Sequence, residues 1–151
     1  MPQHEDRVLY EFLILESMQA GLSWRTILQK RENYPQGYQG VDPLRISQFG
    51  YQEIEEMLQN QDIIPHRGKL EASLKATKIF LEIQKEHGSF ATYLWNFADG
   101  KTIHNHRTSL SEIPVTTALS EQLRKDLKKR VIWEAFFAVR RKDFFYLFCI
   151  S

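Results

Sequence analysis

The stretch LESMQAGLSWRTILQKRENY, residues 15–34, decides the fold of this chain. It completes a run of apolar residues at three-to-four spacing, which predicts an amphipathic helix ending at Gly21. Ser23 is the expected N-cap of a second helix, and Asn33-Tyr34-Pro35 is expected to end it, because the residue before a proline disfavours helical dihedrals. Two helices should therefore meet at a tight corner that contains Gly21 and Ser23.

Helical signals continue along most of the chain. Asp42-Pro43 is expected to open a third helix, since an acidic N-cap followed by proline is a favoured start. A long amphipathic run closes at Gly88, after which Ser89 can cap a short aromatic helix. Residues 98–114 lack periodicity and are expected to form a loop, and a further helix carries Leu119, Leu123 and Leu127. No strict alternation is long enough to predict a sheet, so the expected fold class is all-α.

Length and composition favour one domain. The 151 residues are expected to form a single helical domain over residues 1–151, and the 42% hydrophobic content argues against disorder. No apolar run is long enough to span a membrane, and the first residues lack a secretory signal. Cys149 is the only cysteine, so an internal disulfide cannot form. We expect a cytoplasmic monomer with no membrane partner.

Charge is distributed unevenly along the chain. Residues 1–63 hold five Lys or Arg against ten Asp or Glu, whereas residues 64–151 hold fifteen against nine. The most basic stretch, residues 124–142, holds eight basic and two acidic residues. Such a basic half is a candidate footprint for phosphates, although solvated helix faces produce the same pattern.

Glu16 is the first candidate site residue, because it stands among the apolar residues Leu13, Ile14, Leu15 and Met18. A carboxylate in a dry site is costly or has a shifted pKa. The alternative is a boundary residue, whose stem lies on the core while its head reaches water.

Gln19 lies three residues further along the same helix face, and Trp24 starts the next helix. A carboxylate, an amide and an indole are thus expected to converge on one corner, with Gln19 supporting the pocket. These groups can hold a flipped-out base, because they supply an acceptor for its exocyclic amine and an aromatic plane for its face. Taken alone, Trp24 is more often a core aromatic than a platform for a base.

Residues 62–69, DIIPHRGK, connect two amphipathic helices. A turn with Gly68 at a helix start leaves backbone N–H groups at the positive end of the helix dipole. This arrangement suits a phosphate flanked by Arg67 and Lys69. An ordinary helix–helix turn with exposed basic residues remains the alternative.

Other chemistries have weaker signals. His104 and His106 form a His-x-His pair, but nothing nearby supplies the second pair of ligands that a structural zinc needs. Cys149 has no obvious partner base, which argues against a thiolate nucleophile. The sequence also lacks a Gly-rich nucleotide loop of the usual spacing.

Residues 15–24 and 26–34 closely resemble the signature of the DNA-3-methyladenine glycosylase I family, also called Tag. Further similarity lies at residues 42–43, in the hairpin 63–69, and from residues 111–114 through 127–130. The resemblance thus covers roughly residues 5–130, and residues 131–151 form a divergent tail.

The resemblance implies a helix-hairpin-helix DNA glycosylase that flips 3-methyladenine out of duplex DNA and hydrolyses its N-glycosidic bond. Glu16 then corresponds to the base-recognising carboxylate and Trp24 to the aromatic that stacks on the lesion, as the candidate catalytic pair. Arg67, Gly68 and Lys69 fall in the hairpin that contacts the DNA backbone. The implied partner is double-stranded DNA that contains alkylated adenine, and the implied process is base excision repair.

The resemblance also implies a structural zinc, built in family members from Cys and His residues near both ends. None of these ligands stands at the matching places here, so we expect the chain to bind no zinc and to need no other cofactor. Three possibilities remain compatible with the sequence. The first is an active 3-methyladenine glycosylase, and the second is a catalytically impaired relative that only binds DNA or a lesion. The third is a helical scaffold that retains no site.

Overall fold

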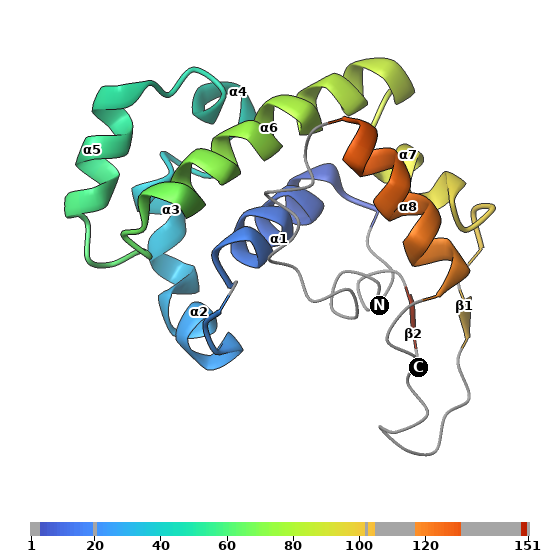
Figure 1. Cartoon of the computed structure of the whole chain (residues 1–151), viewed down its shortest axis with the longest axis horizontal. Coiled ribbons are helices and arrows are strands. Elements are labelled where there is room, and N and C mark those ends of the chain that lie inside the picture. Colours follow the sequence, from blue (N-terminus) through green and yellow to red (C-terminus); the bar gives the residue numbers. More distant parts are fainter. Residues whose placement is uncertain (1–3, 20, 102, 105–116, 131–148, 151) are drawn as a thin grey trace.

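The structure, a computed structural model, describes residues 4–19, 21–101, 103–104, 117–130 and 149–150. The side chains of Trp24, Ser120 and the four residues of two short strands lie outside this description. Two helices form the centre of the described part, α1 (Asp6–Gln19) and the long α6 (Arg67–His87), which pack against each other (Figure 1).

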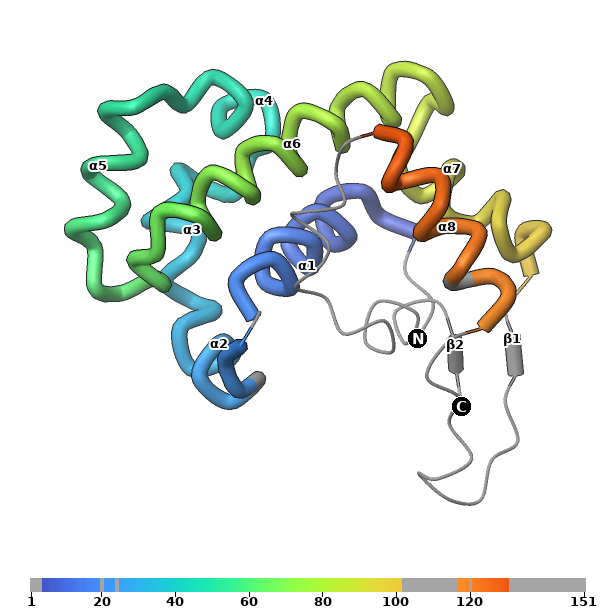
Figure 2. The backbone as a smooth tube through the Cα atoms, in the orientation of Figure 1, coloured from blue at the N-terminus to red at the C-terminus, as the bar shows by residue number. Residues whose placement is uncertain are grey.

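The remaining helices surround this central pair. After α1 the chain forms α2 (Trp24–Lys30), the 3-10 helix η1 (Arg31–Asn33), α3 (Tyr34–Gly37), α4 (Pro43–Ile46) and α5 (Tyr51–Gln59). At the far end of α6 lie α7 (Phe90–Asn96) and α8 (Ala118–Lys129), as the tube in Figure 2 shows. The site residues predicted from the sequence belong to α1, α2 and the first turn of α6.

An aromatic core joins α1 to α6 and α7. Phe80 of α6 packs between Tyr10 and Phe90, with ring centroids 4.9 Å and 4.6 Å away. The hydroxyl of Tyr10 lies 2.6 Å from the hydroxyl of Thr77, so this buried polar group has a partner. Burial of aromatic area at this junction fixes how α1 lies on α6.

Three predicted N-caps are confirmed. Each cap side chain accepts a hydrogen bond from a backbone N–H of the first turn that follows: Ser23 from Thr26 (3.2 Å), Asp42 from Leu44 (3.0 Å) and Ser89 from Thr92 (2.9 Å). Gly88 ends α6 with φ +83°, a conformation that L side chains rarely adopt.

One predicted boundary is wrong. Pro35 does not end the helical segment but lies in the first turn of α3, after α2 has already ended at Lys30. The fixed φ of proline suits this position, where its missing N–H costs nothing.

The all-α prediction is confirmed, with a small addition. Ile103–His104 (β1) pairs in parallel with Cys149–Ile150 (β2). Strands of two residues are too short to be predicted from an alternation of apolar and polar residues. Residues 105–114 of the predicted loop lie outside the described residues. In the part of the chain that the structure describes, no helix is both long and apolar enough to cross a bilayer.

Candidate active site

Glu16 lies inside the protein. It belongs to the second half of α1, where every residue from Leu13 to Gln19 is buried, and only 2% of its surface is exposed. Its Oε2 atom is inaccessible to water. The alternative of a boundary residue with its head in water is therefore wrong. An ionisable group at such a depth needs a donor or a positive charge nearby, because burial disfavours its charged form.

The corner after α1 is held by Gln19. Its side-chain Nε2 donates to the carbonyl of Leu22 at 2.7 Å, and the backbone N–H of Leu22 donates to the Gln19 carbonyl, also at 2.7 Å. Between them Gly21 adopts φ +74°, which favours glycine at this position. The amide of Gln19 thus shapes the turn that leads from α1 to the Ser23 cap of α2.

Trp24 is the first residue of α2, directly after this corner. Its backbone therefore lies next to the segment that carries Glu16, as the sequence spacing predicted. The direction of its indole lies outside what the structure describes, so the predicted convergence of the indole with Glu16 stays a prediction.

The end of α1 is also held from α6. The Nζ of Lys69 donates to the carbonyl oxygen of Met18 at 3.0 Å, although 51 residues separate the two. Lys69 is only partly exposed, and desolvation lowers the pKa of its ammonium. The hydroxyl of Tyr38 lies 4.0 Å from the Met18 sulfur and 3.2 Å from the Ser73 hydroxyl, so α3 supports the same turn. Nothing in the local sequence signals these contacts.

The predicted hairpin, residues 63–69, comprises the end of the connection between α5 and α6 and the first turn of α6. Just before it, the connection is held from α2 and η1, since Lys30 donates to the carbonyl of Gln61 and Asn33 donates to the carbonyl of Asp62. His66 is the N-cap of α6, where its Nδ1 accepts a 3.4 Å hydrogen bond from the N–H of Lys69. The connection before α6 is therefore joined by hydrogen bonds to the last residue of α2 and to η1.

Arg67 lies at the surface but already has carboxylate partners. Its guanidinium pairs with Glu55 of α5, approaches Glu71 at 4.0 Å, and stacks 5.6 Å from the ring centroid of Tyr51. The hydrogen bond with Glu55 raises the pKa of Arg67 and lowers the pKa of Glu55. The structure thus separates the two predicted hairpin cations, with Arg67 facing α5 and Lys69 reaching α1.

The described part of the basic stretch 124–142 contains two paired arginines and three exposed lysines. Arg130 pairs with Glu86 at 2.8 Å and with Asp126 at 3.2 Å, and the Tyr93 hydroxyl donates to Asp126 at 2.7 Å. Arg124 pairs with Glu121 at 2.8 Å. Residues 131–142 lie outside the described residues. Arg130 thus links α8 to α6 and α7, which argues against the two arginines as phosphate ligands. A phosphate footprint on the exposed lysines stays a prediction.

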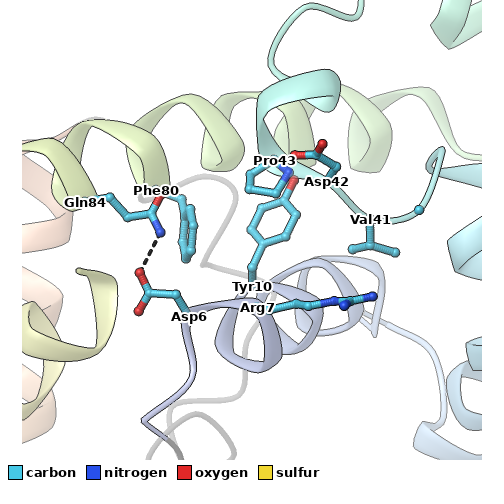
Figure 3. A pocket seen from close by; sticks show the side chains of 9 residues that line it. Asp6, Arg7, Tyr10, Val41, Asp42, Pro43, Phe80 and Gln84 are labelled. Carbon is cyan, nitrogen blue, oxygen red and sulfur yellow. Dashed lines mark hydrogen bonds between the residues drawn. The ribbon is translucent and has the colours of Figure 1, made fainter. Parts of the chain in front are cut away.

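A pocket of about 430 Å³ opens elsewhere, between α1, α4 and α6 (Figure 3). Its walls are Tyr10, Val41, Pro43 and Phe80. One of its two acidic residues, Asp6, accepts hydrogen bonds from Gln84 at 2.5 Å and from the first N–H groups of α7, those of Phe90 and Ala91, at 2.8 Å. Asp6 is thus part of the framework, and the pocket does not include Glu16.

The described residues do not fit a structural zinc. None of their His, Cys, Asp and Glu side chains form a group of three or more placed to hold a metal ion. His106, and the side chains of His104 and Cys149, lie outside this part of the chain. No step of the chemistry below depends on a metal.

Comparison with known proteins gives one consistent family. The methyladenine glycosylase family model matches residues 1–134. DNA-3-methyladenine glycosylase 1 of Escherichia coli K12 is 36% identical over 130 residues, which cover 86% of this chain and 70% of that protein. DNA-3-methyladenine glycosylase of Haemophilus influenzae is 39% identical over 129 residues, covering 85% and 70%.

Solved structures agree with the sequence relatives. A crystal structure of 3-methyladenine DNA glycosylase I matches with a TM-score of 0.81 and 38% identity, over 93% of this chain and 81% of that chain. The Staphylococcus aureus enzyme, solved to explain recognition of 3-methyladenine, matches with a TM-score of 0.81 and 31% identity, over 93% and 79%. The chain thus shares both sequence and fold with these enzymes over most of its length, and it belongs to the methyladenine glycosylase family.

Proposed function

We propose that this chain hydrolyses the N-glycosidic bond of 3-methyladenine in alkylated double-stranded DNA, with Glu16 as the residue that recognises the base. The observation that carries this proposal is the burial of Glu16 beside the α1–α2 corner, in a chain of the methyladenine glycosylase family. A carboxylate is held at that depth at a cost in solvation, and a cationic ligand offsets part of that cost.

The chemistry of the substrate suits such a site. Methylation at N3 makes adenine cationic, so the bond between N9 and the sugar carbon C1′ is weak. Hydrolysis breaks this bond with its electron pair going to the base, while water adds to C1′ and releases a proton. The leaving group needs little help, so a protein can act mainly by selecting the base and by stabilising the transition state electrostatically.

Selectivity follows from charge. The base has to leave the stack before a side chain can reach its edges. We assign Glu16 to accept a hydrogen bond from the flipped base and Trp24 to stack on its face. A cationic base gains from both contacts, through a charge-assisted hydrogen bond and a cation–π interaction. Neutral adenine gains less, so it is released less readily.

The hairpin is the proposed contact with the DNA backbone. The first turn of α6, which contains Gly68, begins a helix of 21 residues whose dipole favours a phosphate at this end. The ion pair of Arg67 with Glu55 is exposed, and exposed pairs contribute little, so a phosphate can replace the carboxylate at low cost.

Release of the base is the direct test. Purified protein is incubated with methylated duplex DNA, and free 3-methyladenine is measured by chromatography. We expect release well above the spontaneous rate, and much less with Glu16→Gln. Binding of methylated duplex without release would favour the impaired, binding-only relative. The absence of both base release and preferential binding of methylated duplex would refute the proposed function.

A further inference from the structure

Lys69 connects the two parts of the proposed site. Its backbone belongs to the hairpin end of α6, where its N–H donates to the His66 carbonyl at 3.0 Å. Its side chain leaves the hairpin and ends on α1, where Nζ donates to the Met18 carbonyl at 3.0 Å. A single residue thus contacts both the segment proposed to meet DNA and the segment that carries Glu16.

The contact on α1 is favourable for a cation. Met18 lies in the last turn of α1, where backbone carbonyls lack partners within the helix. An ammonium bound there satisfies one such carbonyl and interacts well with the negative end of the helix dipole. The lowered pKa of Lys69 reflects the desolvation that accompanies this position. An ammonium that is already bound to a backbone carbonyl is less available to a phosphate.

The position of Met18 gives this contact a consequence for the site. Met18 is two residues after Glu16 and one before Gln19, and all three are buried. A displacement of this turn would move the carboxylate of Glu16 and the corner that Gln19 holds. Recognition of a flipped base depends on placement within a fraction of an ångström, so small movements have large effects.

We propose that Lys69 is a positioning residue of the base site, which fixes the last turn of α1 and thereby Glu16, and is not a phosphate ligand. This inference rests on the proposed function, and it replaces the role that the sequence suggested for Lys69. It also links the hairpin to the base pocket, because any movement of the first turn of α6 on DNA is transmitted to α1 through this side chain.

The test compares two substitutions on α6 with the free base as the probe. Lys69→Met removes the ammonium but keeps an unbranched apolar stem, and Lys75→Met makes the same change at an exposed lysine of the same helix. We expect Lys69→Met to weaken binding of free 3-methyladenine about tenfold, as for loss of a charged hydrogen bond. Its affinity for undamaged duplex and the salt dependence of that affinity should not change. Lys75→Met should bind the free base like the wild type, and Lys69→Arg should recover most of the loss.

Two further measurements make the outcome decisive. Amide hydrogen exchange of residues 16–23 should be faster in Lys69→Met than in the wild type, with exchange in α7 unchanged. If Lys69→Met does not fold, Lys69→Gln tests the same expectation with a stem too short to reach Met18. A role as phosphate ligand predicts the opposite pattern, with weaker binding to undamaged duplex, a salt slope reduced by about one, and unchanged affinity for the free base. That pattern would overturn the inference alone, whereas a wild-type chain that binds no free base would also overturn the assignment of Glu16 as the residue that recognises the base.

Discussion

The two ends of α6 both gather charged side chains, but those charges make different contacts. At the C-terminal end Arg130 bridges Glu86 and Asp126, and Tyr93 donates to Asp126, so opposite charges meet in a closed network. At the N-terminal end Lys69 binds a backbone carbonyl two residues from the buried Glu16. The arrangement at the C-terminal end holds helices together. The arrangement at the N-terminal end holds the turn of α1 that carries Glu16. Substitutions at the two ends should therefore separate into effects on stability and effects on activity.

The largest expected effect is at Glu16. Glu16→Gln should reduce 3-methyladenine release by roughly 10- to 100-fold, the loss of one charged hydrogen-bond partner. The free energy of unfolding should not decrease, because a neutral amide is less costly to bury than a carboxylate. Single-turnover excision and chemical denaturation measure the two quantities. Glu82→Gln, an exposed change on α6, is the matched control. A lower free energy of unfolding in Glu16→Gln, alongside the lower excision rate, would instead give Glu16 a structural role.

The opposite pattern is expected at Tyr93. Tyr93→Phe removes the 2.7 Å hydrogen bond to Asp126 and should lower the free energy of unfolding by about 1 kcal/mol. Excision should be unchanged at temperatures well below the melting transition, because the network lies at the far end of α6 from Glu16. A reduced excision rate in folded Tyr93→Phe would break the separation between the two ends.

Arg67 should affect DNA binding only slightly. Arg67→Met is expected to weaken binding to damaged and undamaged duplex alike, by a few-fold, and to reduce the salt slope by about one. The effect is small because a single phosphate contact contributes only part of the affinity for duplex DNA. Binding isotherms at several salt concentrations measure it. Selective loss of lesion binding would contradict the assignment of Arg67 as a contact with the DNA backbone. Arg67 and Lys69 would then both act on the base site.

Acid should weaken the C-terminal network. Burial of Asp126 raises its pKa, but the hydrogen bonds from Tyr93 and Arg130 outweigh it and lower the pKa of this carboxyl below its ordinary value of 3.8. A depressed pKa contributes stability that is present above the ordinary value and is lost as pH falls below it. Asp126→Asn should therefore lose less stability than the wild type between pH 4 and pH 2, both measured by thermal melting. Parallel curves for the two proteins would show that the network contributes little.

Local chemistry explains which parts of the fold could be predicted. The caps at Ser23, Asp42 and Ser89 depend on residues within one helical turn, so the sequence contains all that determines them. The candidate Glu16 could be identified because it interrupts an apolar helix face. Its burial could not be decided, since it depends on how other helices such as α6 and α2 pack on α1, and that packing is not local.

The contacts of the hairpin cations show the same limit. Arg67 and Lys69 are two residues apart and looked equivalent, yet one faces Glu55 and the other reaches Met18. The difference depends on how α5 and α1 lie beside α6, which spacing within the hairpin does not reveal. Pro35 was misjudged for a related reason, because proline both ends helices and starts them, and only the preceding turn decides.

The most direct test of the central claim is to locate the site where free 3-methyladenine binds. Backbone amide resonances of ¹⁵N-labelled protein are followed by nuclear magnetic resonance while the free base is added. The predicted result is that the affected resonances belong to residues 16–24 and the first turn of α6, with α7 and α8 unchanged, and that Glu16→Gln abolishes the shifts. Shifts centred on the pocket of Tyr10 and Phe80, or on the Arg130 network, would contradict the assignment of Glu16 as the residue that recognises the base.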